Sequence, residues 1–125
     1  MSNVFHVSKK VRTYWAKVHV GLKVRSTGEI LDKELVLHVC DDYCQLVGLC
    51  VSVADTMFVY TGGREPGVVI GLINYPRFPS SRRRIRTHAL DLADRCMEIC
   101  RQCRVSVVTP RRTYMLSDLV RIGKS

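Results

Sequence analysis

The sequence predicts an α+β fold of the ferredoxin-like, split βαβ type, which is an antiparallel sheet with two helices on one face. The chain has 125 residues, a length that fits one domain with one core. Apolar residues make up 46% of it and charged residues 25%, as in ordinary globular proteins. The apolar positions follow strand and helix periods in the order β-α-β-β-α-β. We therefore expect a single domain over 1–125, a βαββαβ core over 14–108 and a basic C-terminal extension over 111–125.

The first half of the core contains a strand, a helix and a second strand. Residues 14–24 alternate between apolar and polar, which predicts a strand with one inward face. From about Asp32 the apolar residues fall at helical spacing, and Gly48 is a plausible end of this helix. Residues 49–60 predict the second strand. Gly-Gly and Pro-Gly pairs within 61–67 then predict a turn.

The second half contains a strand, a long helix and a final strand. Residues 68–73 are almost all apolar and predict a central strand, which runs into a loop with two prolines. Ser80 or Ser81 caps a helix that extends to about Gln102. Residues 105–108 predict a strand, and 113–116 an edge strand beyond it. The inward stripe of the long helix is expected to be Ile85, Ala89, Leu92, Cys96, Ile99 and Cys103.

The six cysteines invite a metal or disulfide interpretation. Cys96, Cys100 and Cys103 have the C-x3-C-x2-C spacing of enzymes that hold an iron–sulfur cluster. On a helix, however, these positions share the predicted core face, and cysteine is among the most buried residue types. Cys40 and Cys44 lack the C-x2-C partner typical of structural zinc. We expect packed thiols, with no metal and no cofactor.

No segment of the sequence predicts export or a membrane span. The N-terminus, from Met1 to His6, lacks a basic stretch followed by an apolar one. No apolar run approaches the roughly 18 to 20 residues that a spanning helix needs. We therefore expect a cytoplasmic protein without a membrane partner.

The charge is distributed unevenly along the chain. The net charge is +9, with +5 in residues 1–30, −4 in 31–75 and +8 in 76–125. Two basic ends around an acidic middle can steer anions to particular surfaces. The simpler alternative is that the charges only keep the protein soluble.

The segment 74–86 is where we expect an anionic ligand to bind. A stiff loop leads into a helix whose first turns carry four arginines, and these repel both one another and the positive helix end. A bound phosphate group would relieve that repulsion, and the loop aromatics would stack on a base. The alternative is a solvated charge run with two core aromatics. The predicted ligand-binding residues are Asn74, Tyr75, Arg77, Phe78, Arg82, Arg83, Arg84 and, if the last strand ends nearby, Arg111.

Catalysis has no recognisable motif in this sequence. It contains no nucleophile elbow, Walker loop or Gly-x-Gly-x-x-Gly pattern. The adjacent carboxylates Asp41 and Asp42 point in different directions on the predicted helix. We therefore expect no catalytic residues, and a protein that binds rather than an enzyme.

The order of motifs resembles the phage Thoeris anti-defence sponge family over residues 14–108. The resemblance lies in a strand ending Val20-Gly21-Leu22-Lys23, a turn with Thr27-Gly28, and a long helix leading to Gln102-x-x-Val105-Ser106-Val107. It implies a homo-oligomer in the cytoplasm of a bacterial host cell. Such proteins sequester a small anionic nucleotide, of the cyclic ADP-ribose type or a cyclic oligonucleotide, without degrading it. The cysteines and Arg101 at the end of the last helix depart from the family, as does the basic tail, so no family ligand residue is carried over.

Two other functions remain open from the sequence. The first is a nucleic-acid-binding module, because split βαβ folds often place sheet aromatics under bases and basic ends on phosphates. The acidic middle of the chain and the lack of an obvious pair of exposed sheet aromatics argue against it. The second is an inhibitor that binds a host protein. An open sheet also favours association between copies, because association covers its edges.

Overall fold

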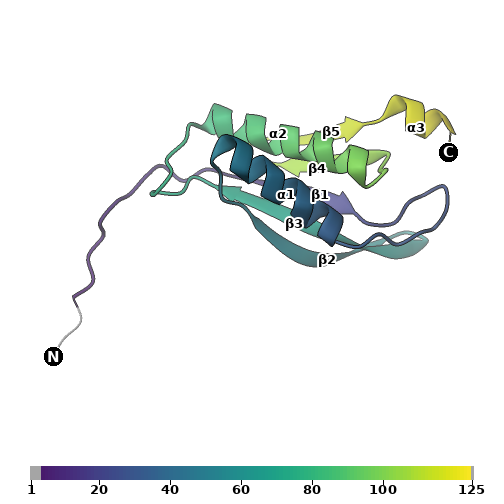
Figure 1. Cartoon of the computed structure of the whole chain (residues 1–125), viewed down its shortest axis with the longest axis horizontal. Coiled ribbons are helices and arrows are strands. Elements are labelled where there is room, and N and C mark those ends of the chain that lie inside the picture. Colours follow the sequence, from purple (N-terminus) through teal and green to yellow (C-terminus); the bar gives the residue numbers. More distant parts are fainter. Residues whose placement is uncertain (1–3, 125) are drawn as a thin grey trace.

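The computed structural model describes residues 4–124 and contains an antiparallel sheet with helices packed on it (Figure 1). Residues 1–3, part of the segment searched for an export signal, and Ser125 lie outside the described residues. The elements are β1 (Trp15–Gly21), α1 (Glu34–Val47), β2 (Ser52–Tyr60), β3 (Gly63–Ile73), α2 (Arg82–Ile99), β4 (Arg104–Val108), β5 (Thr113–Ser117) and α3 (Leu119–Lys124).

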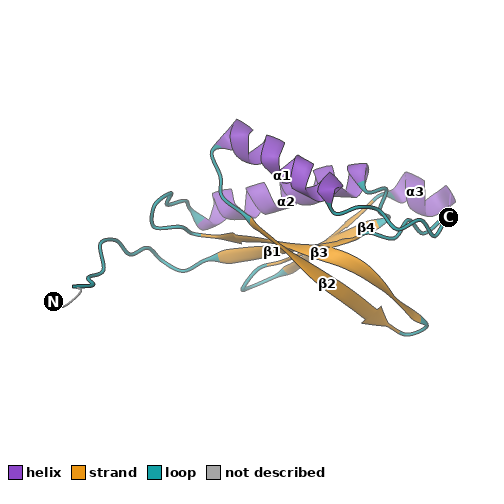
Figure 2. Ribbon diagram, turned by 60° about the horizontal axis from the view of Figure 1, so that its bottom comes forward, coloured by secondary structure: helices purple, strands orange, loops and turns teal. Residues whose placement is uncertain are grey.

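The strand order in the sheet is β2-β3-β1-β4-β5, and all neighbours are antiparallel. The first four strands in this order are those of a split βαβ fold, and α1 and α2 both cover one face of the sheet (Figure 2). The predicted fold class is therefore confirmed. β5 extends the sheet beyond β4, so residues 111–124 form a hairpin strand and a short helix.

The core lies between the two helices and the inward face of the sheet. In β1 the side chains of Ala16, Val18 and Val20 are fully buried, whereas the residues between them face the open side of the sheet. This is the two-residue period that the sequence predicts. The α2 stripe is also confirmed at Ile85, Ala89, Leu92 and Cys96, each at most 1% exposed.

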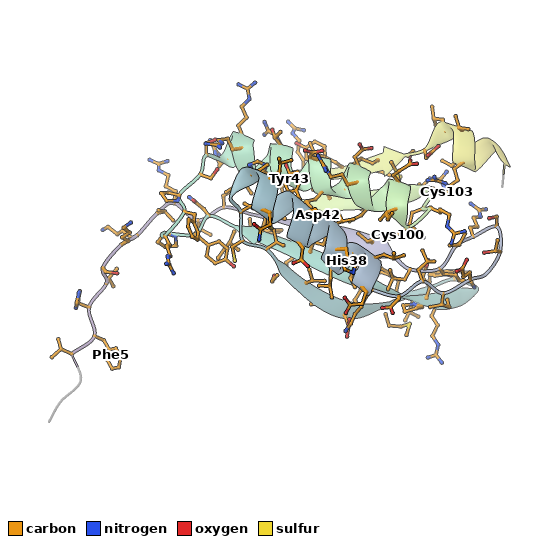
Figure 3. The ribbon with its side chains drawn as sticks, in the orientation of Figure 1. Phe5, His38, Asp42, Tyr43, Cys100 and Cys103 are labelled. Carbon is orange, nitrogen blue, oxygen red and sulfur yellow. The ribbon has the colours of Figure 1, made fainter. Side chains whose placement is uncertain are left out.

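The two helices are joined by a polar contact inside their interface. The hydroxyl of Tyr43, on α1, lies 2.7 Å from Nδ1 of His88, on α2. The guanidinium carbon of Arg95 lies 5.0 Å from the centre of the Tyr43 ring. Figure 3 shows Tyr43 on the side of α1 that faces α2. Burial and the neighbouring Asp91 raise the pKa of Tyr43 to about 12, so its hydroxyl stays protonated.

Two predicted boundaries are wrong. The turn expected over 61–67 is only a two-residue connection, because Tyr60 pairs directly with Gly63 and Gly62 supplies the positive φ of 94°. Arg64 to Gly67 therefore belong to β3. The long helix ends at Ile99 and not at Gln102, which leaves Ile99 46% exposed and Cys103 beyond the helix.

The cysteines are free thiols, and most of the motif is packed in the core. Cys96 and Cys100 are fully buried, as predicted, whereas Cys103 is only partly buried. Burial raises the pKa of Cys100 to about 11 and that of Cys40 to about 12. These thiols are therefore protonated at neutral pH and are weak nucleophiles.

The histidines predict a loss of stability in mild acid. Burial lowers the pKa of His88, and the charge of Arg84 lowers it further, whereas Asp91 has a smaller opposing effect. Burial, followed by the charge of Lys17, lowers the pKa of His19. The unfolded chain takes up these protons near a pKa of about 6.5, before the folded chain does. The contribution of the two histidines to stability is therefore complete above the pKa of the unfolded chain. It is lost as the pH falls through their lower pKa values in the folded protein.

We expect a lower urea midpoint at pH 5.5 than at pH 7.5, and a smaller difference in His88→Gln. His38→Gln, at an exposed position, is the matched control and should keep the full difference. Equal midpoints at the two pH values in the unaltered protein would contradict this interpretation.

Candidate functional site

A cavity of about 450 Å³ lies at the end of the sheet where β1 stops. Pockets that hold small ligands span roughly 300 to 1,000 Å³. This one is assembled from the segment after β1, the β2–β3 hairpin and the turn between α2 and β4. Its lining residues are Lys23, Arg25, Tyr60, Glu65, Arg101, Gln102, Cys103 and Arg104.

Glu65 is the only carboxylate in this lining, and the backbone holds it in place. β3 directs its side chain to the open face of the sheet, where the amide of Lys23 donates a hydrogen bond of 3.2 Å to Oε2. The amide of Leu22 donates to the Pro66 carbonyl at 3.0 Å, so the chain after β1 stays beside β3. Glu65 is half-buried and is positioned without an ion pair to any residue in 4–124.

Gln102 reaches the same place from the turn after α2. Arg101 has a positive φ of 51°, which reverses the chain and aims the next side chain back at the sheet. Gln102 is 9% exposed, and its Nε2 donates to the carbonyls of Lys23 and Cys100, both at 3.0 Å. Arg121, on α3, donates to the Gln102 carbonyl at 2.9 Å. The C-terminal extension thus fixes the turn that carries Gln102.

The Glu65 and Gln102 side chains meet over Gly21, the last residue of β1. A Cβ at Gly21 would lie 2.8 Å from Glu65 Oε2 and 3.0 Å from Gln102 Oε1. Both contacts are shorter than those of ordinary packing, so a Cβ at position 21 would displace the end of the Glu65 side chain, the Gln102 side chain or both. We call the cavity around these residues the Gly21 pocket.

One aromatic ring and several cations complete the Gly21 pocket. Tyr60 is 48% exposed, and its ring lies against Gly63, where a Cβ would be 3.3 Å from Cε2. Arg101 is paired with Glu29 at 2.8 Å. Arg25 and Arg104 form no ion pair with a carboxylate of residues 4–124. One fixed carboxylate beside free cations suits a ligand that carries both signs of charge.

Six of the eight predicted site residues line two cavities at the opposite end of the sheet. Arg82, Arg83 and Arg111 come together in a cavity of about 370 Å³. Tyr75, Phe78 and Arg84 line a smaller one of about 100 Å³, between the β3–α2 loop and α2. Whether any of them binds a ligand stays a prediction.

Two of the predicted residues have structural contacts. Asn74 Nδ2 donates to the Arg12 carbonyl at 2.8 Å, and its Oδ1 accepts from the Ser80 amide at 2.8 Å. This side chain therefore ties the loop to the segment before β1. The Arg77 guanidinium carbon lies 5.6 Å from the centre of the Phe78 ring.

Sequence reasoning missed Tyr60, Glu65 and Gln102 as site residues. Glu65 was assigned to a turn, and Gln102 to the end of a helix, so neither was expected to face a cavity. The available signal was Glu65 itself, an acidic residue directly before a run of apolar strand residues.

The described part of the chain has neither a metal-binding cluster nor a membrane-spanning helix. Among residues 4–124, no group of three His, Cys, Asp or Glu side chains is placed to hold a metal ion. No helix in that range is long and apolar enough to cross a membrane.

The fold is similar to that of two solved structures of a phage enzyme. The structure of a phage SAM lyase in complex with S-methyl-5′-thioadenosine has a TM-score of 0.72 and 17% identity, over 90% of this chain and 97% of that chain. A phage SAM lyase in the apo state has a TM-score of 0.71 and 20% identity, over 85% and 90% respectively. No family model and no curated protein matches the sequence. The Thoeris sponge family is not among these findings.

The expectation that the chain is not an enzyme is contradicted by this comparison. The fold that the sequence predicted is the fold of a lyase. The expectation rested on missing motifs for nucleophiles and phosphate loops. A pocket whose phenol and carboxylate come from one hairpin and whose amide comes from a distant turn has no such motif.

The Gly21 contact predicts a local effect of substitution. In Gly21→Ala, we expect the new Cβ to push Glu65 off the Lys23 amide. Losing one hydrogen bond, worth about 0.5 to 1.5 kcal/mol, would speed exchange of that amide about 2- to 10-fold. Hydrogen exchange by NMR checks this, with the central β1 amides as the internal control. Unchanged exchange at Lys23 would show that the contact does not hold Glu65.

Proposed function

We propose that this chain binds SAM, S-adenosylmethionine, in the Gly21 pocket and cleaves it, releasing S-methyl-5′-thioadenosine. The observation that carries the proposal is the pairing of Glu65 with Gln102 over Gly21, beside an exposed tyrosine and free arginines. The fold similarity supports it, because it extends over nearly the whole of both chains.

The charges of the ligand fit those of the pocket. SAM carries a sulfonium and an ammonium cation, a carboxylate and an adenine ring. Glu65 offers the anion, Arg25 and Arg104 attract the carboxylate end, and Tyr60 offers a ring for the adenine. Gln102 is held rigidly by two backbone carbonyls and limits the depth of the pocket.

The reaction balances without water or a cofactor. The bond between sulfur and the γ-carbon of the methionine part breaks, and its electron pair stays on sulfur, which becomes a neutral thioether. The four-carbon fragment then completes its own valences. Either its carboxylate oxygen bonds to the γ-carbon to form a lactone, or its β-carbon gives up a proton, which the solvent accepts, to form a double bond.

Glu65 acts best on the ammonium group of the ligand. The sulfonium loses its charge as the bond breaks, so an anion against sulfur would stabilise the substrate more than the transition state and slow the reaction. The ammonium keeps its charge throughout. Holding it fixes the orientation of the amino-acid end, which is a large source of rate enhancement.

In a phage-infected cell this reaction would serve anti-defence. Many host modification reactions consume SAM as a methyl donor, and cleavage removes the donor. The proposal keeps the small nucleotide-derived ligand expected from the sequence, and replaces sequestration with turnover.

The oligomer expected from the sequence is retained in the proposal. Neither α1 nor α2 covers the other face of the sheet (Figure 2). That face carries half-buried Trp15, Phe58 and Val69 and exposed Ile73. Association of copies through this face would cover apolar surface that one copy leaves in water.

The proposal predicts turnover that depends on Glu65. Incubation with SAM should produce S-methyl-5′-thioadenosine, detected by liquid chromatography and mass spectrometry. Glu65→Gln should lower the rate about 100-fold or more, because the amino-acid end is then no longer held in the reactive orientation. The mass of the four-carbon product distinguishes the hydrolysed lactone, which is heavier by one water, and chromatographic retention against standards distinguishes the lactone from its unsaturated isomer.

Glu34→Gln is the matched control, because it removes the same charge from an exposed position in the first turn of α1. Its rate should equal that of the unaltered protein. SAM recovered intact after long incubation with folded protein would reject the proposed reaction.

A further inference from the structure

We infer that the arginine-lined cavity at the other end of the sheet binds the phosphate backbone of a nucleic acid. The cavity has a volume of about 370 Å³ and lies between the start of α2 and the β4–β5 hairpin. Five arginines line it, namely Arg82, Arg83, Arg86, Arg111 and Arg112. We call it the arginine cavity.

No acidic residue balances these charges. The lining of the arginine cavity contains no carboxylate, and none of its five guanidinium groups forms an ion pair with a carboxylate of residues 4–124. Four of the five residues are exposed. Elsewhere in the described chain, Arg95, Arg101 and Arg121 each pair with an acid. Five unpaired cations around one hollow repel one another, and an anion relieves that repulsion.

The hairpin that carries two of the arginines is held in a defined shape. The hydroxyl of Thr109, a residue only 6% exposed, donates to the Arg112 carbonyl at 2.9 Å. The same oxygen accepts from the Arg112 amide at 3.1 Å. Arg111 and Arg112 thus project from a closed turn. On the other wall, Ser81 caps α2 by accepting a hydrogen bond of 3.1 Å from the Arg84 amide, which fixes the start of the helix that carries Arg82 and Arg83.

The basic surface continues beyond the cavity along the N-terminal segment. Tyr14 lines the cavity, and the described residues before it include exposed Lys9, Lys10 and Arg12. This segment runs away from the domain as an extended arm, with Phe5 near its far end (Figure 3). Asn74 holds the arm where it meets the domain, through the Arg12 carbonyl.

A polymer of phosphates matches this surface better than a small ligand. One phosphate accepts hydrogen bonds from one or two guanidinium groups. Here five arginines line the cavity, and the arm carries three further basic residues. A nucleic-acid strand supplies one charge for about every 3.4 Å along its axis. The half-buried ring of Tyr114 in the cavity wall offers a face to a base.

The arginine cavity is separate from the Gly21 pocket. They lie at the two ends of β1, next to Tyr14 and Lys23 respectively. At a rise of about 3.3 Å per strand residue, the ends of β1 alone are about 20 Å apart. Nucleic-acid binding therefore does not depend on the proposed lyase activity, and the two can fail separately.

Fluorescence anisotropy with labelled single-stranded and duplex DNA of random sequence tests the inference. With about five phosphate contacts, affinity should fall about 100- to 500-fold between roughly 50 and 200 mM salt. The triple variant Arg83→Ala/Arg111→Ala/Arg112→Ala should bind at least about 10-fold more weakly, with a salt slope smaller by about 2 to 3. Replacing the same three residues with lysine should restore most of the binding.

The matched control is Lys17→Ala/Lys33→Ala/Arg64→Ala, which loses three positive charges outside the arginine cavity. It should keep the affinity of the unaltered protein. Both triple variants should keep their circular dichroism and cleave SAM at the original rate. Absence of binding at low salt, an equal loss in the control, or equally strong competition by poly-aspartate of similar length would overturn the inference.

Discussion

Both pockets depend on the packing of β1 in the middle of the sheet. Its inward residues Ala16, Val18 and Val20 are completely buried, and it pairs with β3 on one side and β4 on the other. The register of these pairings places Gly21 opposite Gly67 and sets Glu65 beside the end of β1. The other end of β1 lies beside the β4–β5 hairpin. A slip of one residue in β1 would exchange its buried and open faces and separate both groups of side chains.

The Gly21 pocket is made by close approach rather than by a continuous motif. The β2–β3 hairpin supplies a phenol and a carboxylate, the distant turn after α2 supplies an amide, and glycines leave room for each of them. Gly21 accommodates Glu65 and Gln102, and Gly63 accommodates the Tyr60 ring. Arg121 on α3 reaches back to the Gln102 carbonyl, so the last helix stabilises a site at the far end of α2.

The sequence predicted the layers of the fold because its apolar periods are clear. The alternation in β1 and the stripe of α2 from Ile85 to Cys96 are both present in the structure. The boundaries that failed are those where local signals compete with tertiary pairing. The Gly-Gly and Pro-Gly pairs indicated a long turn, yet pairing with β2 draws Arg64 to Gly67 into β3.

The site was harder to predict than the fold for the same reason. Glu65 reaches the pocket only because β3 begins early, and Gln102 reaches it only because α2 ends at Ile99 and Arg101 takes a left-handed conformation. By contrast, Arg82 and Arg83 were recognised as one charge run, and Arg111 was included on the condition that the last strand ends near α2, which it does in the structure. A charge run is visible in a sequence, whereas a contact over a glycine is not.

The proposed role of Glu65 is to hold the amino-acid end of SAM through its ammonium group. Calorimetry with two uncleaved ligands tests it most directly. S-adenosylhomocysteine carries the ammonium group, and S-methyl-5′-thioadenosine lacks it. We expect Glu65→Gln to weaken binding of the first about 10-fold or more, the cost of a lost hydrogen bond to a charged group, and to leave binding of the second within about twofold. Equal effects on the two ligands would contradict this role for Glu65.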